Sequence, residues 1–338
     1  MPSLASRLNF LSQWAMHLLM ISFDWEAAMR SNTRLFLYAV SSMLLCLSAN
    51  VPIRAQDVPD DYKEVLKDLE RKGDFSANVL KVNVPRNDVQ MSIGGVATPT
   101  PFGFGGWVAM TKGDDGKDVM MGDLVLLQDE VNPVMSALLE NGIDVTALHN
   151  HFFWEEPRIF YMHLHGYGKA MDLAHRVKPA LDLIGHVGPI SAANAKPASL
   201  AGTLDAEKIA AIVGHKGDQT GAVYKITVGR SDLSVTEHGA TINARMGLNT
   251  WAAFFGTNDN AMVAGDVAML ETEGTPVLKA LRKNGLEIVA IHHHMTGDRP
   301  MIIFLHYWGK GPAERLAAGF KAALDELGKR SGATGTHD

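Results

Sequence analysis

Eight of the fourteen histidines lie in two short windows whose spacing is suited to binding a metal ion. The windows read HNHFFWEEPRIFYMHLH at 149–165 and HHHMTGDRPMIIFLHYW at 292–308. Alternate residues of a β-strand project from the same face, so a His-x-His pair presents two imidazole rings on one side. Three histidines and one carboxylate recur at matching positions, and divalent transition metals accept such a donor set. The two sets are His149, His151, Glu155 and His163, and His292, His294, Asp298 and His306.

The first window is predicted to form an antiparallel hairpin, and its register decides which rings meet. A turn centred on residue 156 places His149 opposite His163. A turn centred on residue 157 instead places His149 opposite His165 and His151 opposite His163. Both registers gather the imidazoles on one face, whereas a slip of one residue would move one pair to the other face.

We expect each repeat to bind one divalent transition metal. Zn is the expected ion, and Mn, Fe, Cu and Ni are alternatives for such ligands. His165 can supply a further ligand in the first window, but Trp308 stands at the matching position of the second window. The two sites can therefore differ in how many positions on the metal they leave open.

Three functions remain as alternatives at this stage, and the sequence leaves open whether the protein is an enzyme. A metal with an open position would polarise a substrate oxygen or activate water, with Glu155 or Asp298 as ligand or proton carrier. A closed site would store or deliver metal. In the third alternative the histidines are structural, and the protein is a non-catalytic module that binds an envelope component.

The histidine windows belong to a long internal duplication. The strand-like segments NVLKVNV at 78–84 and AVYKITV at 222–228 are related by an offset of 144 residues, as are Trp107 and Trp251. After one residue is lost, the offset becomes 143 and stays constant through the histidines. The predicted repeats are residues 61–184 and 205–327, and a linker rich in small residues at 185–204 separates them.

Periodicity within each repeat predicts alternating blocks of helices and strands. In the first repeat we expect helices at 61–71, 133–139 and 170–184, and strands at 79–84, 107–110, 119–127, 145–152 and 158–165. This order predicts an α+β fold, a tandem duplication in which each repeat is a mainly antiparallel sheet with packed helices.

Four further carboxylates are matched between the repeats. Asp123 and Asp266 each follow a glycine, and Glu130 and Glu273 follow the next apolar segment. Turns and helix starts commonly carry carboxylates at such places. We therefore expect structural roles for all four, not metal binding.

The N-terminal region resembles an export signal. Two arginines precede the short apolar run LFLYAVSSMLLCL at 35–47, and small residues follow it, so we expect a signal peptide at 29–55. Residues 1–28 are expected to be a non-native upstream extension. The single cysteine, Cys46, lies inside the apolar run and lacks a small residue before it. Membrane anchoring after cleavage is therefore not expected.

Charge and composition point away from nucleic acid as a partner. The formal net charge is −6, and no long basic stripe is present. A small molecule or a component of the cell envelope is the expected partner of a periplasmic or secreted protein.

The pattern at 122–168, from GDLVLLQDE through HNHFFWEEPR to HLHGYG, resembles the exported bacterial family named after the mycobacterial lipoproteins LppY and LpqO. The resemblance covers both repeats. It implies an envelope or secreted protein of uncharacterised function, often lipid-anchored. It assigns no catalytic residue.

Overall fold

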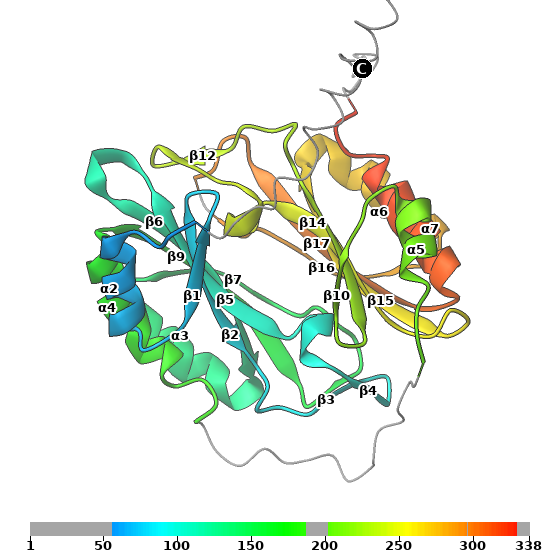
Figure 1. Ribbon diagram of the computed structural model, residues 1–338, viewed down its shortest axis with the longest axis horizontal. Helices are drawn as coiled ribbons and strands as arrows, with labels where there is room; N and C mark the ends of the chain where they lie inside the picture. The colour runs from blue at the N-terminus through cyan, green and yellow to red at the C-terminus, as the bar shows by residue number, and fades with distance from the viewer. Residues whose placement is uncertain (1–55, 187–201, 296, 330–338) are drawn as a thin grey trace, which may run out of the picture. The chain divides into compact units, whose positions relative to one another are not determined.

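The computed structural model describes residues 56–186, 202–295 and 297–329, and these segments contain two copies of one α+β unit (Figure 1). Each copy is a six-stranded sheet in which all neighbouring strands are antiparallel. The first sheet has the order β1 (Gly73–Ser76), β2 (Val79–Pro85), β5 (Gly105–Lys112), β6 (Asp118–Leu127), β9 (Ile159–Gly168) and β7 (Asp144–His149). The second has the order β10 (Asp218–Thr220), β11 (Val223–Gly229), β14 (Asn249–Gly256), β15 (Ala261–Leu270), β17 (Ile302–Gly311) and β16 (Glu287–His292).

Three helices cover one face of each sheet, so the predicted α+β duplication is confirmed. They are α2 (Asp60–Asp68), α3 (Val131–Glu140) and α4 (Ala170–Leu181) in the first repeat, and α5 (Ala206–Val213), α6 (Glu271–Lys283) and α7 (Ala313–Leu324) in the second. None of the helices in the described segments is long and apolar enough to cross a bilayer.

Strand β6 shows how each sheet is buried on both faces. Met120 and Leu124 pack in the core under the helices, whereas Met121 and Val125 point to the opposite face. Alternation in a strand therefore separates two apolar faces here, and the strand reads as a nearly continuous apolar run. Asp123 lies on the second of these faces, in the middle of the strand.

The two sheets pack against each other through the faces that the helices leave uncovered. Phe102 and Phe152 of the first repeat share one buried cluster with Phe255 and Trp308 of the second. The layers run helix, sheet, sheet, helix, with the helices of the two repeats on opposite sides (Figure 1). Any polar group on the inner faces is therefore enclosed between the repeats.

The register of the histidine hairpin differs from both predictions. His149 pairs with Tyr161, and Ala147 pairs with His163, after a bulge between Val145 and Ala147. The reason lies in the loop, because residues 150–158 do not form a tight turn. Within this loop, β8 (Glu155–Glu156) leaves the hairpin and pairs with β3 (Met91–Ile93). The shift is an even number of residues, so His149, His163 and His165 still share the inner face.

Short hairpins that the sequence reading missed stand next to this loop. In the first repeat β3 pairs with β4 (Val96–Thr98), and in the second β12 (Thr236–Glu237) pairs with β13 (Ala240–Thr241). The predicted extension at 1–28, the predicted signal peptide, Cys46 and most of the predicted linker lie outside the described residues.

Candidate metal centre

Six histidines meet between the two sheets, three from each repeat. They are His149, His151, His163, His292, His294 and His306. The closest ring pairs join the repeats: the centroids of His149 and His292 are 3.7 Å apart, and those of His151 and His306 are 3.6 Å apart. The matching pair His294 and His163 is 4.0 Å apart. The cluster thus follows the approximate two-fold relation between the repeats.

The bulge in the edge strand β7 helps to hold the cluster together. The hydroxyl of Thr146, at this bulge, donates a hydrogen bond of 2.8 Å to the carbonyl oxygen of His294. His294 lies just beyond the end of β16, as His151 lies beyond the end of β7. The backbone of one repeat therefore positions a histidine of the other.

Two of the rings are oriented by backbone carbonyls. Nδ1 of His163 lies 3.2 Å from the carbonyl oxygen of Gly122, and Nδ1 of His306 lies 3.3 Å from that of Gly265. A carbonyl can only accept, so each Nδ1 carries the hydrogen and each Nε2 keeps its lone pair. This is the arrangement that metal-binding histidines usually have.

The other four rings have no hydrogen-bond partner at either nitrogen among the described residues. They are His149, His151, His292 and His294. A buried polar atom without a partner costs about 1–3 kcal/mol, so such groups are rare and call for an explanation. A cation bound among these rings would satisfy one nitrogen of each histidine that binds it.

Burial keeps the six rings neutral. Removal from water lowers the pKa of His163 and of His306 to about 3. It also strongly lowers the pKa of the other four, and the charges of neighbouring histidines lower it further. Neutral imidazole is the form that binds a metal, so the cluster is ready to do so at neutral pH.

Two groups of three histidines could each bind one metal ion, and both groups include residues of the two repeats. Within each group the ligand nitrogens lie within 4.8 Å of one another. One comprises His149, His292 and His306, and another comprises His163, His292 and His294. A third, within the second repeat, adds a carboxylate to two histidines: Asp266, His294 and His306. The expected separate site in each repeat is thus replaced by one shared cluster.

The two predicted carboxylate ligands, Glu155 and Asp298, belong to none of these groups among the described residues. Because β8 pairs with β3, Glu155 lies outside the histidine cluster. Its Oε1 lies 3.3 Å from Nε of Arg158. Oδ2 of Asp298 accepts a hydrogen bond of 2.7 Å from the backbone nitrogen of Ile302. Burial raises the pKa of both carboxyl groups. Asp298 is thus held within its own loop, whereas the carboxylate oxygens of Glu155 have no hydrogen-bond partner among the described residues.

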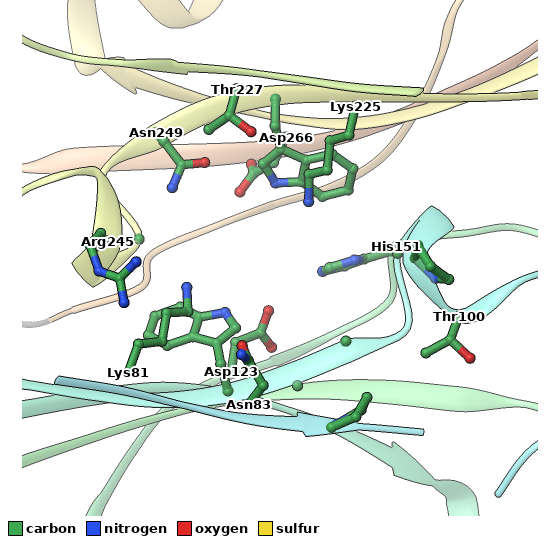
Figure 2. A pocket seen from close by; sticks show the side chains of 18 of the residues that line it. Lys81, Asn83, Thr100, Asp123, His151, Lys225, Thr227, Arg245, Asn249 and Asp266 are labelled. Carbon is green, nitrogen blue, oxygen red and sulfur yellow. The ribbon is translucent and has the colours of Figure 1, made fainter. Parts of the chain in front are cut away.

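A cavity of about 700 Å³ opens beside the histidines (Figure 2). His151, His294 and His306 form part of its wall. The rest of the lining includes three pairs of residues that are equivalent in the two repeats: Lys81 and Lys225, Trp107 and Trp251, and Asp123 and Asp266. Each lysine Nζ lies over the tryptophan ring of its own repeat, at 4.1 Å and 4.0 Å from the ring centres.

Burial also changes the charges in this cavity. It raises the pKa of Asp123 to about 7 and that of Asp266 well above the ordinary value. It lowers the pKa of Lys81 and of Lys225 to about 8. Groups that titrate near neutral pH beside a candidate metal site are typical of functional sites.

Two segments of the chain, residues 63–183 and 207–326, match the family model described as Domain of Unknown Function (DUF1259). The chain belongs to this family. It contains two tandem DUF1259 domains, and no curated protein matches it.

Two solved structures are similar to this DUF1259 protein only at low scores. The trimeric bacterial microcompartment shell protein PduB is 11% identical over 73% of this chain and 87% of its own, with a TM-score of 0.17. EtuB from Clostridium kluyveri is 11% identical over 76% and 91%, with a TM-score of 0.18. Similarities this weak carry no argument about the DUF1259 fold or function.

The predicted ligand His165 lies in a second, smaller cluster of the DUF1259 protein. Its Nε2 is 2.7 Å from Oε1 of Glu237, and the two residues form a metal-competent group with His238. This cluster has no counterpart on the other side of the two-fold relation. The matching residues there are Trp308, Ile93 and Gly94.

Sequence reasoning missed part of the DUF1259 pocket. Lys81 and Lys225 are each the one charged residue in a matching apolar strand. A lysine repeated at such a position is the sequence signal that could have identified them. Asp123 and Asp266 were expected to have structural roles, but both lie mid-strand on the inner face and line the cavity. Glu130 is confirmed as a structural residue, since it accepts from the backbone nitrogen of Leu127 at 2.7 Å.

Proposed function

We propose that the protein binds a divalent transition metal at the six-histidine cluster, in a site that the two repeats build together. The observation that carries the proposal is the enclosed set of neutral imidazoles whose nitrogens face one another without hydrogen-bond partners. Zn is the proposed ion, because its usual protein ligands include imidazole nitrogen and carboxylate oxygen. Mn, Fe, Cu and Ni are the alternatives.

The cavity favours a metal-dependent enzyme over a storage protein. A storage site is closed by its ligands, whereas three of these histidines line a cavity large enough for a small molecule. A bound divalent metal supplies polarisation of a ligand oxygen or activation of water. Asp123, whose pKa burial raises to about 7, is placed to take up or release a proton near neutral pH.

The sequence supports a proposal about location as well. The apolar run at 35–47 and the pattern at 122–168 support an exported envelope protein of the LppY/LpqO type, periplasmic or secreted, with no nucleic-acid partner. Cell fractionation of the full chain tests this part. Recovery of the unprocessed chain in the cytoplasm alone would contradict it.

Elemental analysis of protein purified without an affinity tag tests the metal site. We expect about one equivalent of a first-row transition metal. His149→Ala and His292→Ala should each remove most of it, although the two residues belong to different repeats, because the ligands of one ion come from both. The exposed His215 is the matched control, and His215→Ala should leave the metal content unchanged.

Two results would contradict the shared site. The first is less than a tenth of an equivalent of metal in the wild type, with no uptake when metal is added. The second is two equivalents, of which each single variant removes only one. That second pattern would indicate an independent site in each repeat.

A further inference from the structure

Two partly buried lysines, Lys81 and Lys225, line the cavity without forming a direct ion pair. Within the described residues neither Lys81 nor Lys225 has a carboxylate oxygen within 4.0 Å of its Nζ, whereas the cavity residue Arg245 is paired with Asp74. Each Nζ instead lies against a tryptophan face. A cation–π contact offsets only part of the cost of burying an ammonium group.

The two ammonium groups point into the same space from opposite sheets (Figure 2). Lys81 comes from β2 and Lys225 from β11, at equivalent positions of the two repeats. Burial is the main cause of the lowered pKa of Lys81, and the charges of Arg245 and Lys225 lower it further. Like charges held this way favour a ligand whose negative charge lies between them.

The charged side chains that line the cavity indicate the sign and magnitude of the ligand's charge. Arg245 is paired with Asp74, so it adds no net charge. Lys81 and Lys225 therefore bring two positive charges into the cavity that no carboxylate pairs with directly. A dianion would balance these two charges.

One end of the cavity differs from the other and would orient the ligand. Arg245 and Asn249 line one end, where the equivalent residues of the first repeat are Pro101 and Gly105. Figure 2 shows Arg245, Asn249 and Thr227 together at one end and His151 and Thr100 at the other. The two ends of the cavity thus carry different polar groups, with a guanidinium at one end only, and this suits a ligand whose two ends differ.

We infer that the cavity binds a small organic dianion, through a carboxylate or phosphate group held between Lys81 and Lys225, beside the histidine cluster. This deepens the proposed function, because it names the class of molecule that reaches the metal. The volume of about 700 Å³ is in the range of small-molecule sites. The lysines act as charge anchors on opposite walls of the cavity.

Isothermal titration of the full chain tests the inference, with inorganic phosphate, succinate and neutral succinamide as probes, before and after loading with Zn. The dianions should bind and succinamide should not. Comparison of phosphate with succinate distinguishes the two anion classes. Hydrogen bonds to charged groups contribute about 1.5–3 kcal/mol, so Lys81→Met and Lys225→Met should each weaken binding at least roughly tenfold.

The controls separate charge from shape and folding. Lys81→Arg and Lys225→Arg keep the charge and should retain more affinity than the methionine variants. Lys279→Met removes an exposed lysine on α6 and should change nothing. Metal content should stay at the wild-type value in every lysine variant.

Each result decides between the two proposals. Dianion binding that survives in the Lys81→Met/Lys225→Met double variant overturns the inference, and so does metal-loaded wild type that binds neither dianion. Lysine-dependent binding in a protein that takes up no metal would support the anion site and overturn the metal centre.

Discussion

The two repeats supply matching residues to the shared centre but differ at other positions between the sheets. Each supplies three histidines, a lysine, a tryptophan and an aspartate to the shared centre. By contrast, His165 is matched by Trp308, and Arg245, which lines the cavity, is matched by Pro101. Residues close to an approximate two-fold axis contribute to one site from both copies. A change in either copy would therefore impair the whole site.

Matching between the repeats does not by itself identify a functional residue. Arg86 and Glu130 form a buried ion pair of 2.5 Å, and Arg230 and Glu273 form the equivalent pair of 2.8 Å. The arginine also donates to a strand carbonyl, and the glutamate accepts from backbone nitrogens. These groups are satisfied within the protein, whereas most nitrogens of the six histidines have no hydrogen-bond partner. The difference in hydrogen bonding separates a structural pair from a binding site.

The largest effect is expected when the metal-free protein is acidified. A histidine whose folded pKa lies below the unfolded value of about 6.5 favours the folded state above that pH. Its contribution is lost as the pH falls from about 6.5 towards the folded value, which is about 3 for His163 and His306. In this pH range the unfolded chain binds protons that the folded cluster does not bind, so acid favours unfolding.

Asp123 and Asp266 have the opposite effect on how stability depends on pH. Burial raises the pKa of Asp123 to about 7, so its folded form binds a proton that the unfolded chain releases, and acid favours folding there. Six histidines outweigh two aspartates, so the free energy of unfolding should fall by several kcal/mol between pH 6.5 and 5. Urea denaturation across this range measures it. A flat profile in the metal-free protein would show that the rings are not buried as neutral groups.

The fold was predictable because its signals are local. Alternating residues placed His149, His163 and His165 on one face, and the duplication gave the same elements twice. The sharing of one centre was not predictable, since no pattern within a repeat shows which faces of two sheets will pack together. The predicted register was wrong for a related reason. Strand β8 pairs with β3, which lies about sixty residues earlier in the chain, and not within the hairpin.

The second effect concerns the structural ion pairs. Removing one partner of a buried pair leaves an uncompensated charge and costs about 3–5 kcal/mol. Glu130→Ala and Glu273→Ala should therefore each lower stability by similar amounts, as measured by urea denaturation of the metal-loaded protein. The metal content of the folded fraction should not change. Loss of metal in either folded variant would contradict the separation between structural pairs and the binding site.

The smallest effect is expected at the cluster of His165, Glu237 and His238, which the two-fold relation between the repeats does not duplicate. Glu237 is buried, and its Oε1 lies 2.7 Å from Nε2 of His165. Glu237→Ala removes this contact and should cost about 1–3 kcal/mol. Glu237→Gln keeps an acceptor oxygen of the same shape and should recover most of the loss. Urea denaturation and elemental analysis are to be made on the same samples.

The metal content decides how this cluster relates to the six histidines. Because Glu237 belongs to no group that includes them, both variants should keep the wild-type metal content. If Glu237→Ala lost metal while it stayed folded, the two clusters would be parts of one centre. If it lost neither metal nor stability, the contact with His165 would contribute nothing. The expected result is a loss of stability alone, which would show that the contact between His165 and Glu237 serves the fold while the matched histidines serve the metal.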